Sequence, residues 1–341
     1  MKKSFSSYLK DYMMLLVLVA VIVMFAILTP ILMPNRNFLD PQNLLNILGQ
    51  NAYLVILGIG ITFIMLGGGM DLSTGYLIST VGVAMALIET SSNVVVAIIC
   101  GILLAVLLSA FNGAMYAWLK VFPFIITLGT QYILNGATYL LTDGISKTIY
   151  VSDVLKNIGG FTIRLGSGAL KTGVIVMVVS VLVGSFILNK TYLGRNIYAL
   201  GSNPDAVALS GVSVTKMRIL IFVLAGFFFG IGQIVNVGTT GGAVNQGLGI
   251  GAEFTVMAGA MLGGIKMGGG GGKMSNMVIG VLIIGVLNYG MNFLNINQYW
   301  KYVVLGIALL AAVTLDTLQT QAAINRAKKV SGQPPKAETT A

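Results

Sequence analysis

Charged side chains are scarce in this sequence of 341 residues, because only 9% of them are Asp, Glu, Lys or Arg. Soluble globular domains carry about 25%, so this shortage excludes a cytosolic enzyme, and the 56% of hydrophobic residues excludes a disordered chain. Histidine is absent, which removes the commonest general base and the commonest metal ligand. The single cysteine, Cys100, excludes an intrachain disulfide. We therefore expect no catalytic residue, no metal site and no cofactor bound by this chain.

The sequence instead contains long apolar stretches without charge, such as 12–35, 90–119 and 219–252. About 20 apolar residues in a helix cross the roughly 30 Å of hydrocarbon in a bilayer. The 44 glycines suit close packing of such helices. The pattern predicts an all-α, polytopic membrane protein with ten transmembrane helices, at about 13–33, 46–66, 72–90, 94–119, 123–142, 171–189, 216–238, 251–266, 274–294 and 300–319.

The positions of Lys and Arg predict how these spans are oriented, because cytoplasmic loops carry an excess of them. With the N-terminus inside, 14 of the 20 basic residues fall on the cytoplasmic side. We therefore expect both termini in the cytoplasm and one transmembrane domain over residues 1–325. This arrangement gives an extracytoplasmic loop at 143–170, a cytoplasmic loop at 190–215 and a disordered cytoplasmic tail at 326–341.

The cytoplasmic loop contains a short predicted helix with both ends marked. Asn203 suits an N-cap, and Pro204 suits the first helical position. Asp205 adds negative charge near the positive helix end, and Gly211 suits the left-handed residue that closes the helix. A helix this short needs a surface to pack on. Two interpretations stay open: it lies on the membrane or its own bundle, or it docks a soluble cytoplasmic partner.

Residues 194–212 resemble the cytoplasmic coupling loop of permease subunits in bacterial ABC importers for simple sugars, a group that includes ribose, xylose and galactose/methyl galactoside permeases. Two further segments, 67–75 and 123–130, are similar to motifs of this family and occur in the same order. The segment 288–316 looks most like the galactose-type members. The resemblance covers about residues 40–320.

The resemblance implies a permease subunit in the bacterial inner membrane that forms the translocation path for a monosaccharide, galactose-, ribose- or xylose-like. It implies three partners: two copies of an ATP-binding cassette subunit or domain, which hold ATP and Mg, an extracytoplasmic sugar-binding protein, and a second permease subunit, identical or different. No nucleic acid is expected, and this chain is not itself an enzyme. Coupling to the ATPase would use Gly201, Asn203, Pro204, Asp205, Ala206, Val207, Ala208, Leu209 and Gly211.

The sequence departs from the family pattern at three positions. Thr255 replaces a residue that is often acidic, and Lys266 and Met267 stand where the family usually has a serine region. These departures point to a different substrate or a different permease partner, and the identity of the sugar stays open.

Several polar residues lie within or beside the predicted spans, where they are costly unless they serve a purpose. Asp71 either caps a helix that starts at Leu72, with Ser73 in its first turn, or acts in gating. Glu253 suits the start of a short span, with a sugar contact as the alternative. The candidate translocation path consists of Asn112, Thr127, Gln131, Asn135, Asn288 and Asn292.

Each of these path residues has two interpretations. Neutral hydrogen-bonding groups suit a sugar path, but they also suit interhelical hydrogen bonds. Two rival functions remain as well. An ion-coupled secondary carrier would use Asp71, and a non-transporting scaffold would bind a cytoplasmic protein through 190–215.

Overall fold

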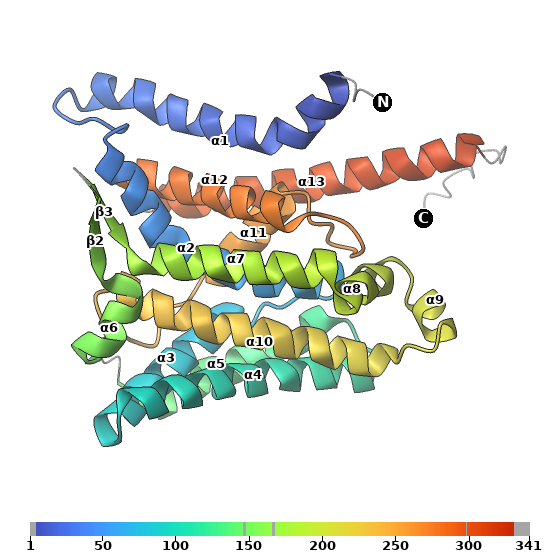
Figure 1. Cartoon of the computed structure of the whole chain (residues 1–341), viewed down its shortest axis with the longest axis horizontal. Helices are drawn as coiled ribbons and strands as arrows, with labels where there is room; N and C mark the ends of the chain where they lie inside the picture. The colour runs from blue at the N-terminus through green and yellow to red at the C-terminus, as the bar shows by residue number, and fades with distance from the viewer. Residues whose placement is uncertain (1–4, 146–147, 166–167, 298, 331–341) are drawn as a thin grey trace.

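The computed structural model describes residues 5–145, 148–165, 168–297 and 299–330, which form an almost entirely helical bundle (Figure 1). The first half contains α1 (Phe5–Leu32), α2 (Pro41–Leu66), α3 (Thr74–Ser91), α4 (Val94–Leu119), α5 (Pro123–Leu140), β1 (Ile149–Tyr150), α6 (Asp153–Gly160), β2 (Thr162–Leu165) and β3 (Gly168–Lys171). The second half contains α7 (Thr172–Lys190), α8 (Tyr192–Ser202), α9 (Pro204–Leu209), α10 (Val214–Thr239), β4 (Ala243–Val244), α11 (Ala252–Leu262), α12 (Met274–Phe293) and α13 (Tyr299–Val330).

Six helices among the described residues are long and apolar enough to cross a membrane: α1, α2, α4, α7, α10 and α12. The predicted all-helical membrane class is therefore confirmed. Helix α11 differs from the predicted span at 251–266, because its 11 residues rise only about 17 Å, roughly half of the hydrocarbon thickness. Glycine-rich turns at Gly263 and Gly264 end it early.

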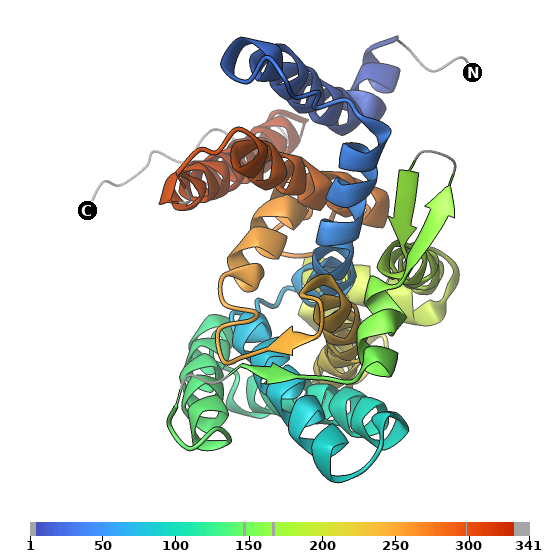
Figure 2. The ribbon, with the colours of Figure 1, turned by 90° about the vertical axis from the view of Figure 1, so that its left-hand side faces the viewer.

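Helix α2 lies at the centre of the bundle (Figure 2). Every residue from Asn51 to Leu66 is buried except Tyr53, which is half-buried. The helix packs against α7, α10, α11 and α12, and Phe63 stacks on Phe228 of α10 with ring centroids 5.8 Å apart. By contrast, only 11% of the apolar part of α1 is buried, against 83% in α2. The bundle is therefore built around α2, and α1 faces outward.

Helices α4 and α10 run antiparallel and in close contact (Figure 1). A Cβ atom on Gly226 of α10 would lie 2.7 Å from the carbonyl oxygen of Ala105 in α4, so no larger residue fits there. One turn away, the hydroxyl of Ser109 donates a hydrogen bond to the carbonyl of Phe222 at 2.7 Å. Small residues allow this approach, as expected for helices in lipid.

The loop expected at 143–170 contains structure that the sequence did not predict. Strand β1 pairs antiparallel with β4, so that Ile149 lies opposite Val244, and β2 pairs antiparallel with β3. Strands of two to four residues are too short to show a period of alternation. Together with α6 they cover one end of the bundle, which we call the sheet end; the opposite end carries α8 and α9 and is called the α9 end (Figure 1).

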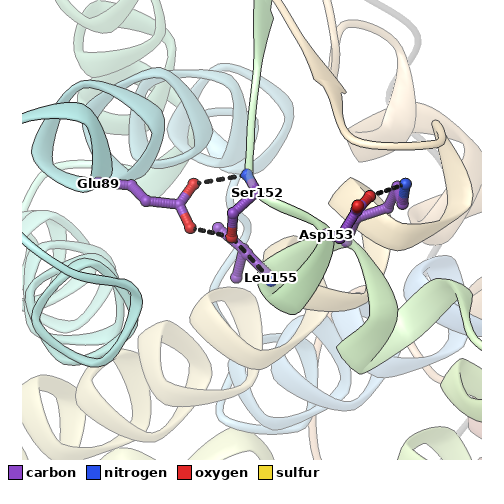
Figure 3. Close-up of polar contacts among 5 residues, drawn as sticks. Glu89, Ser152, Asp153 and Leu155 are labelled. Carbon is purple, nitrogen blue, oxygen red and sulfur yellow. Dashed lines mark hydrogen bonds and ion pairs between the residues drawn. The ribbon is translucent and has the colours of Figure 1, made fainter.

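Figure 3 shows how α6 is held against the end of α3. The carboxylate of Glu89 accepts hydrogen bonds from the backbone N–H of Ser152 at 3.0 Å and from its hydroxyl at 2.5 Å. The Ser152 hydroxyl also caps α6 by accepting from the N–H of Leu155. Within α6, the hydrogen bond and charge of Lys156 hold the pKa of Asp153 below its usual value.

At the C-terminus the structure also differs from the predicted boundary. Helix α13 continues to Val330, beyond the predicted end of its span at 319 and into the segment that was expected to be a disordered tail. The rest of that predicted tail, 331–341, lies outside the described residues.

Candidate functional site

A cavity of about 370 Å³ opens in the sheet-end half of the bundle, among α2, α11, α12, α13 and the turn before α11. Its volume lies in the range of pockets that hold small organic ligands. The polar side chains that line it are Gln50, Asn51, Tyr53, Thr255, Asn288, Tyr289, Asn292, Lys301 and Tyr302. None of the described lining residues is acidic.

The local structure of α12 turns two of these amides toward the cavity. Asn288 and Asn292 are four residues apart and therefore lie one above the other on the same helix face. Neither side chain has a hydrogen-bond partner among the described residues, and the same is true of Gln50 and Lys301. Their donors and acceptors are thus available to a solute.

Three other lining residues already have partners. Asn51 donates to the carbonyl of Ile47 at 2.7 Å, and Thr255 donates to the carbonyl of Gly251 at 2.9 Å. The hydroxyl of Tyr289 donates to Asn43 at 2.9 Å. These residues form the fixed part of the wall. An amide both donates and accepts hydrogen bonds, so the free amides can bind a small, neutral, hydroxyl-rich solute.

Asn112, a predicted path residue, lies elsewhere, in a buried network with Asp71, Ser73 and Thr130. The Asn112 amide donates to the Ser73 hydroxyl at 2.9 Å and accepts from the Thr130 hydroxyl at 2.7 Å. Ser73 donates from its N–H and its hydroxyl to one Asp71 oxygen, at 2.7 and 2.6 Å. All four residues are buried, and none lines the cavity. We call this set the Asn112 network.

The three predicted path residues of α5 also lie away from the cavity. The Thr127 hydroxyl accepts from the N–H of Leu72 at 3.1 Å and donates to the carbonyl of Pro123 at 3.0 Å. Gln131 and Asn135 are half-buried, and the Oε1 atom of Gln131 is buried without a hydrogen-bond partner. Of the six predicted path residues, the structure brings only Asn288 and Asn292 to the cavity.

The two buried carboxylates bind backbone rather than the cavity. Helix α3 begins at Thr74, two residues after the predicted start at Leu72, and Asp71 satisfies the Ser73 N–H just before it. Glu253 accepts from the N–H of Gly251 at 3.1 Å beside the first turn of α11. Both carboxylates are buried at helix starts, where negative charge is favourable.

Other polar residues of the cavity were not predicted from the sequence: Gln50, Asn51, Lys301 and the three tyrosines. Gln50 and Lys301 fall near the starts of the predicted spans at 46–66 and 300–319, where polar residues ordinarily mark the membrane interface. Their positions alone gave no signal of a site. Thr255 was noted only as a departure from a family pattern, and the structure places it in the cavity wall. Lys266 and Met267 lie in the turn after α11, away from the cavity.

At the α9 end, the predicted short helix is present with its predicted caps. Helix α9 begins at Pro204, and the Asn203 side chain accepts from the N–H of Ala206 at 3.0 Å. Gly211 has the positive φ of 85° that a closing glycine adopts. Val207 packs inward, whereas Leu209 is 90% exposed. Helix α9 is therefore anchored through Val207 and leaves the Leu209 side chain uncovered by the described part of the bundle.

Helix α8 connects α9 to the core through backbone contacts. A Cβ atom on Gly201 would lie 1.9 Å from the carbonyl oxygen of Leu66, the last residue of α2, and 2.5 Å from the nitrogen of Gly270. The same Leu66 carbonyl accepts from the Gly270 N–H at 2.9 Å. The Tyr198 hydroxyl donates to the carbonyl of Gly272 at 2.9 Å. A displacement of α8 therefore acts directly on the end of α2, the helix that also lines the cavity.

Comparisons with known proteins place the chain in one family. The family described as the permease component of the branched-chain amino acid transport system matches residues 43–313. The galactose/methyl galactoside import permease protein of Escherichia coli (strain K12) is 33% identical over 338 residues, which cover 93% of this chain and 97% of that protein.

Two further relatives from the same organism carry other sugar names. The ribose import permease protein is 33% identical over 300 residues, covering 88% of this chain and 92% of its own length. The D-allose transport system permease protein is 32% identical over 317 residues, covering 92% of this chain and 94% of its own length. No solved structure matches the chain.

Proposed function

The chain belongs to the family of permease components of the branched-chain amino acid transport system, and from this premise we propose that it is the membrane-spanning permease of an ATP-driven sugar importer. The relatives named for galactose, ribose and allose import support a monosaccharide as the transported solute. The observation that carries the proposal is the cavity, where free amides meet tyrosine rings and no acidic side chain is present among the described lining residues.

For the topology we propose ten membrane-crossing segments, both termini in the cytoplasm, and one permease domain over residues 1–325. Six long helices supply the full spans. Helices α3, α5 and α13 supply three others. The tenth crossing consists of α11, which extends only partway from the sheet end, and the turn 263–273, which reaches the end of α2 at the α9 end. The excess of basic residues on one side supports placing the α9 end in the cytoplasm.

For the transport path we propose that sugar enters from the sheet end, which faces outward in this topology. The cavity opens in that half of the bundle, and its free amides replace water around the sugar hydroxyls without holding them tightly. A sugar-binding protein would deliver the solute to the outer surface formed by α6 and the sheets. A second permease subunit, of the same or another kind, would close the other side of the path.

For coupling we propose that an ATP-binding cassette subunit docks on α9 and that its closure moves α8. ATP and Mg bind to that partner, so this chain carries out no chemistry itself. The exposed tip at Leu209 supports the docking. The backbone contact of Gly201 with Leu66 supports transmission to α2.

The first experiment measures ATP hydrolysis and labelled-monosaccharide uptake in liposomes, with the complex purified through a tag on this chain. Replacing Asn203, Pro204 and Asp205 by alanine is expected to lower both binding-protein-stimulated activities while the bundle stays folded, because α9 loses its cap and its start. A variant with Thr215→Ala and Lys216→Ala serves as the control, since both residues are exposed near α9. Normal stimulation of ATP hydrolysis and uptake in the triple variant would overturn the proposal. So would sugar uptake that needs no ATPase and that an ionophore abolishes.

The second experiment concerns specificity. Thr255 lies in the cavity wall. At this position, permeases of the ABC sugar importers that the sequence resembles often have an acidic residue. We expect Thr255→Asp to change the ratio of galactose to ribose uptake, because a carboxylate near the bound solute adds strong hydrogen-bond acceptors. Lys266→Ser restores another family residue away from the cavity, and it is expected to leave that ratio unchanged.

A further inference from the structure

We propose that a pocket at the α9 end of the bundle binds the phosphate-bearing headgroup of an anionic phospholipid. The pocket has a volume of about 310 Å³ and lies where α4 ends and where α5 and α10 begin. Lys120, Arg218 and Tyr116 line it together with the segment 121–123. It is separate from the sugar cavity, which lies in the other half of the bundle.

The basic residues that line this pocket favour the binding of an anion. The guanidinium of Arg218 stacks on the ring of Tyr116 at 4.3 Å, and its Nε atom is buried without a hydrogen-bond partner. Neither Arg218 nor Lys120 has an ion-pair partner among the described residues, and none of the described lining residues is acidic. The positive end of α5, which starts at Pro123, adds to this field. A buried donor without a partner is unfavourable, and a phosphate oxygen would satisfy it.

The backbone of Lys120 gives a second reason to assign a ligand here. Lys120 closes α4 in the left-handed region, with φ of 54°, where glycine is the usual residue. A lysine in this conformation carries a steric cost that glycine avoids. Despite this cost, the position is a lysine, which lines the pocket and has no ion-pair partner among the described residues. Such strain is typical of positions that bind ligands.

The surroundings of the pocket favour a lipid as the source of the phosphate. Phe122, which lines the pocket, is 80% exposed, and Trp118, two residues before Lys120 at the end of α4, is 68% exposed. Aromatic side chains of this kind sit at the headgroup level of a bilayer, and basic pockets between transmembrane helices bind lipid headgroups. A soluble phosphate would gain nothing from this apolar rim, whereas acyl chains would lie along it.

The inference requires that this end of the helices reaches a bilayer surface, and it holds on either side of the membrane. It also does not depend on which solute is transported. Its test therefore fails or succeeds separately from the importer proposal.

The experiment uses the full chain in detergent and measures bound lipid by native mass spectrometry and the melting temperature by thermal unfolding. The probes are phosphatidylglycerol, phosphatidylcholine and inorganic phosphate, each added separately. We expect phosphatidylglycerol to bind and to raise the melting temperature, while phosphatidylcholine and inorganic phosphate do neither. Lys120→Gln and Arg218→Gln should each weaken phosphatidylglycerol binding about fivefold, the effect of one basic residue at a membrane surface.

Two further variants make the result decisive. Lys190→Gln removes an exposed cation at the same end of the bundle but outside the pocket, and it should bind like the wild type. Lys120→Gly relieves the left-handed backbone, so the lipid-free protein should melt no earlier than the wild type even though it binds less lipid. Equal binding of the two lipids, an equal loss in Lys190→Gln, or a shift with inorganic phosphate alone would each overturn the assignment of a phospholipid.

Discussion

The Asn112 network and the cavity lined by Asn288 and Asn292 contain similar side chains with different hydrogen bonding. Both contain asparagines inside a bundle of transmembrane helices. In the network, Asn112 uses its amide on Ser73, which immediately precedes α3, and on Thr130 of α5. In the cavity, Asn288 and Asn292 have no partner among the described residues. The presence of a hydrogen-bond partner, rather than the residue type, therefore distinguishes a structural amide from one that can bind a solute.

The same substitution in both regions should have different effects on stability. We expect Asn112→Leu to lower the free energy of unfolding by about 1–3 kcal/mol, because the buried Thr130 hydroxyl loses its acceptor. Asn288→Leu should change it by no more than about 0.5 kcal/mol, because no hydrogen bond is lost. Denaturation in detergent measures both values, and equal destabilisation by the two variants would remove the distinction.

Sugar uptake should also depend on the free amides of the cavity. Asn288→Ala and Asn292→Ala should each reduce sugar uptake at low concentration about fivefold, since one hydrogen bond contributes about 1 kcal/mol. Their melting temperatures should stay at the wild-type value. Asn135→Ala is the matched control for Asn288→Ala, because Asn135 is half-buried like Asn288 but lies on α5, away from the cavity. Unchanged uptake in both cavity variants would show that the solute takes another route.

The smallest effect is expected at Gln131, which belongs to neither region. Its Oε1 atom is buried without a partner, so Gln131→Leu removes an unfavourable burial and should leave the melting temperature unchanged or slightly higher. Uptake should be unaffected. A loss of uptake at unchanged stability would instead support the path through α5 that the sequence predicted.

Features that depend on residues close together in the sequence were predicted correctly, whereas features that depend on distant residues were not. The start of α9 was predicted to the residue, because Asn203, Pro204 and Gly211 act within a few positions of one another. The start of α3 was wrong by two residues, since the carboxylate of Asp71 acts ahead of the helix rather than at its first position.

Contacts between distant segments could not be predicted from the sequence. Asn112 and Ser73 are 39 positions apart, and nothing local distinguishes Asn112 from Asn288. Helix α8 was expected as loop, although Leu193, Ile197 and Leu200 repeat at helical spacing and do face the core. The sequence thus contained a helical signal, but Gly194 within the repeat and Gly201 directly after it are residues typical of loops.

The central position of α2 has a consequence for how the protein is made. The helix is the second to leave the ribosome, but α7, α10, α11 and α12, which surround it, are synthesised more than 100 positions later. Until then α2 must reside in lipid with its future contact surfaces bare, held there only by its own hydropathy. In a background with Cys100→Ala, we expect chains truncated before Thr172 to retain α2 in the membrane while a cysteine replacing the buried Val55 reacts with lipid-soluble reagents, a reactivity that full-length chains lose. The bundle therefore completes its core around a helix that is made early, and the helices that bury it are added last.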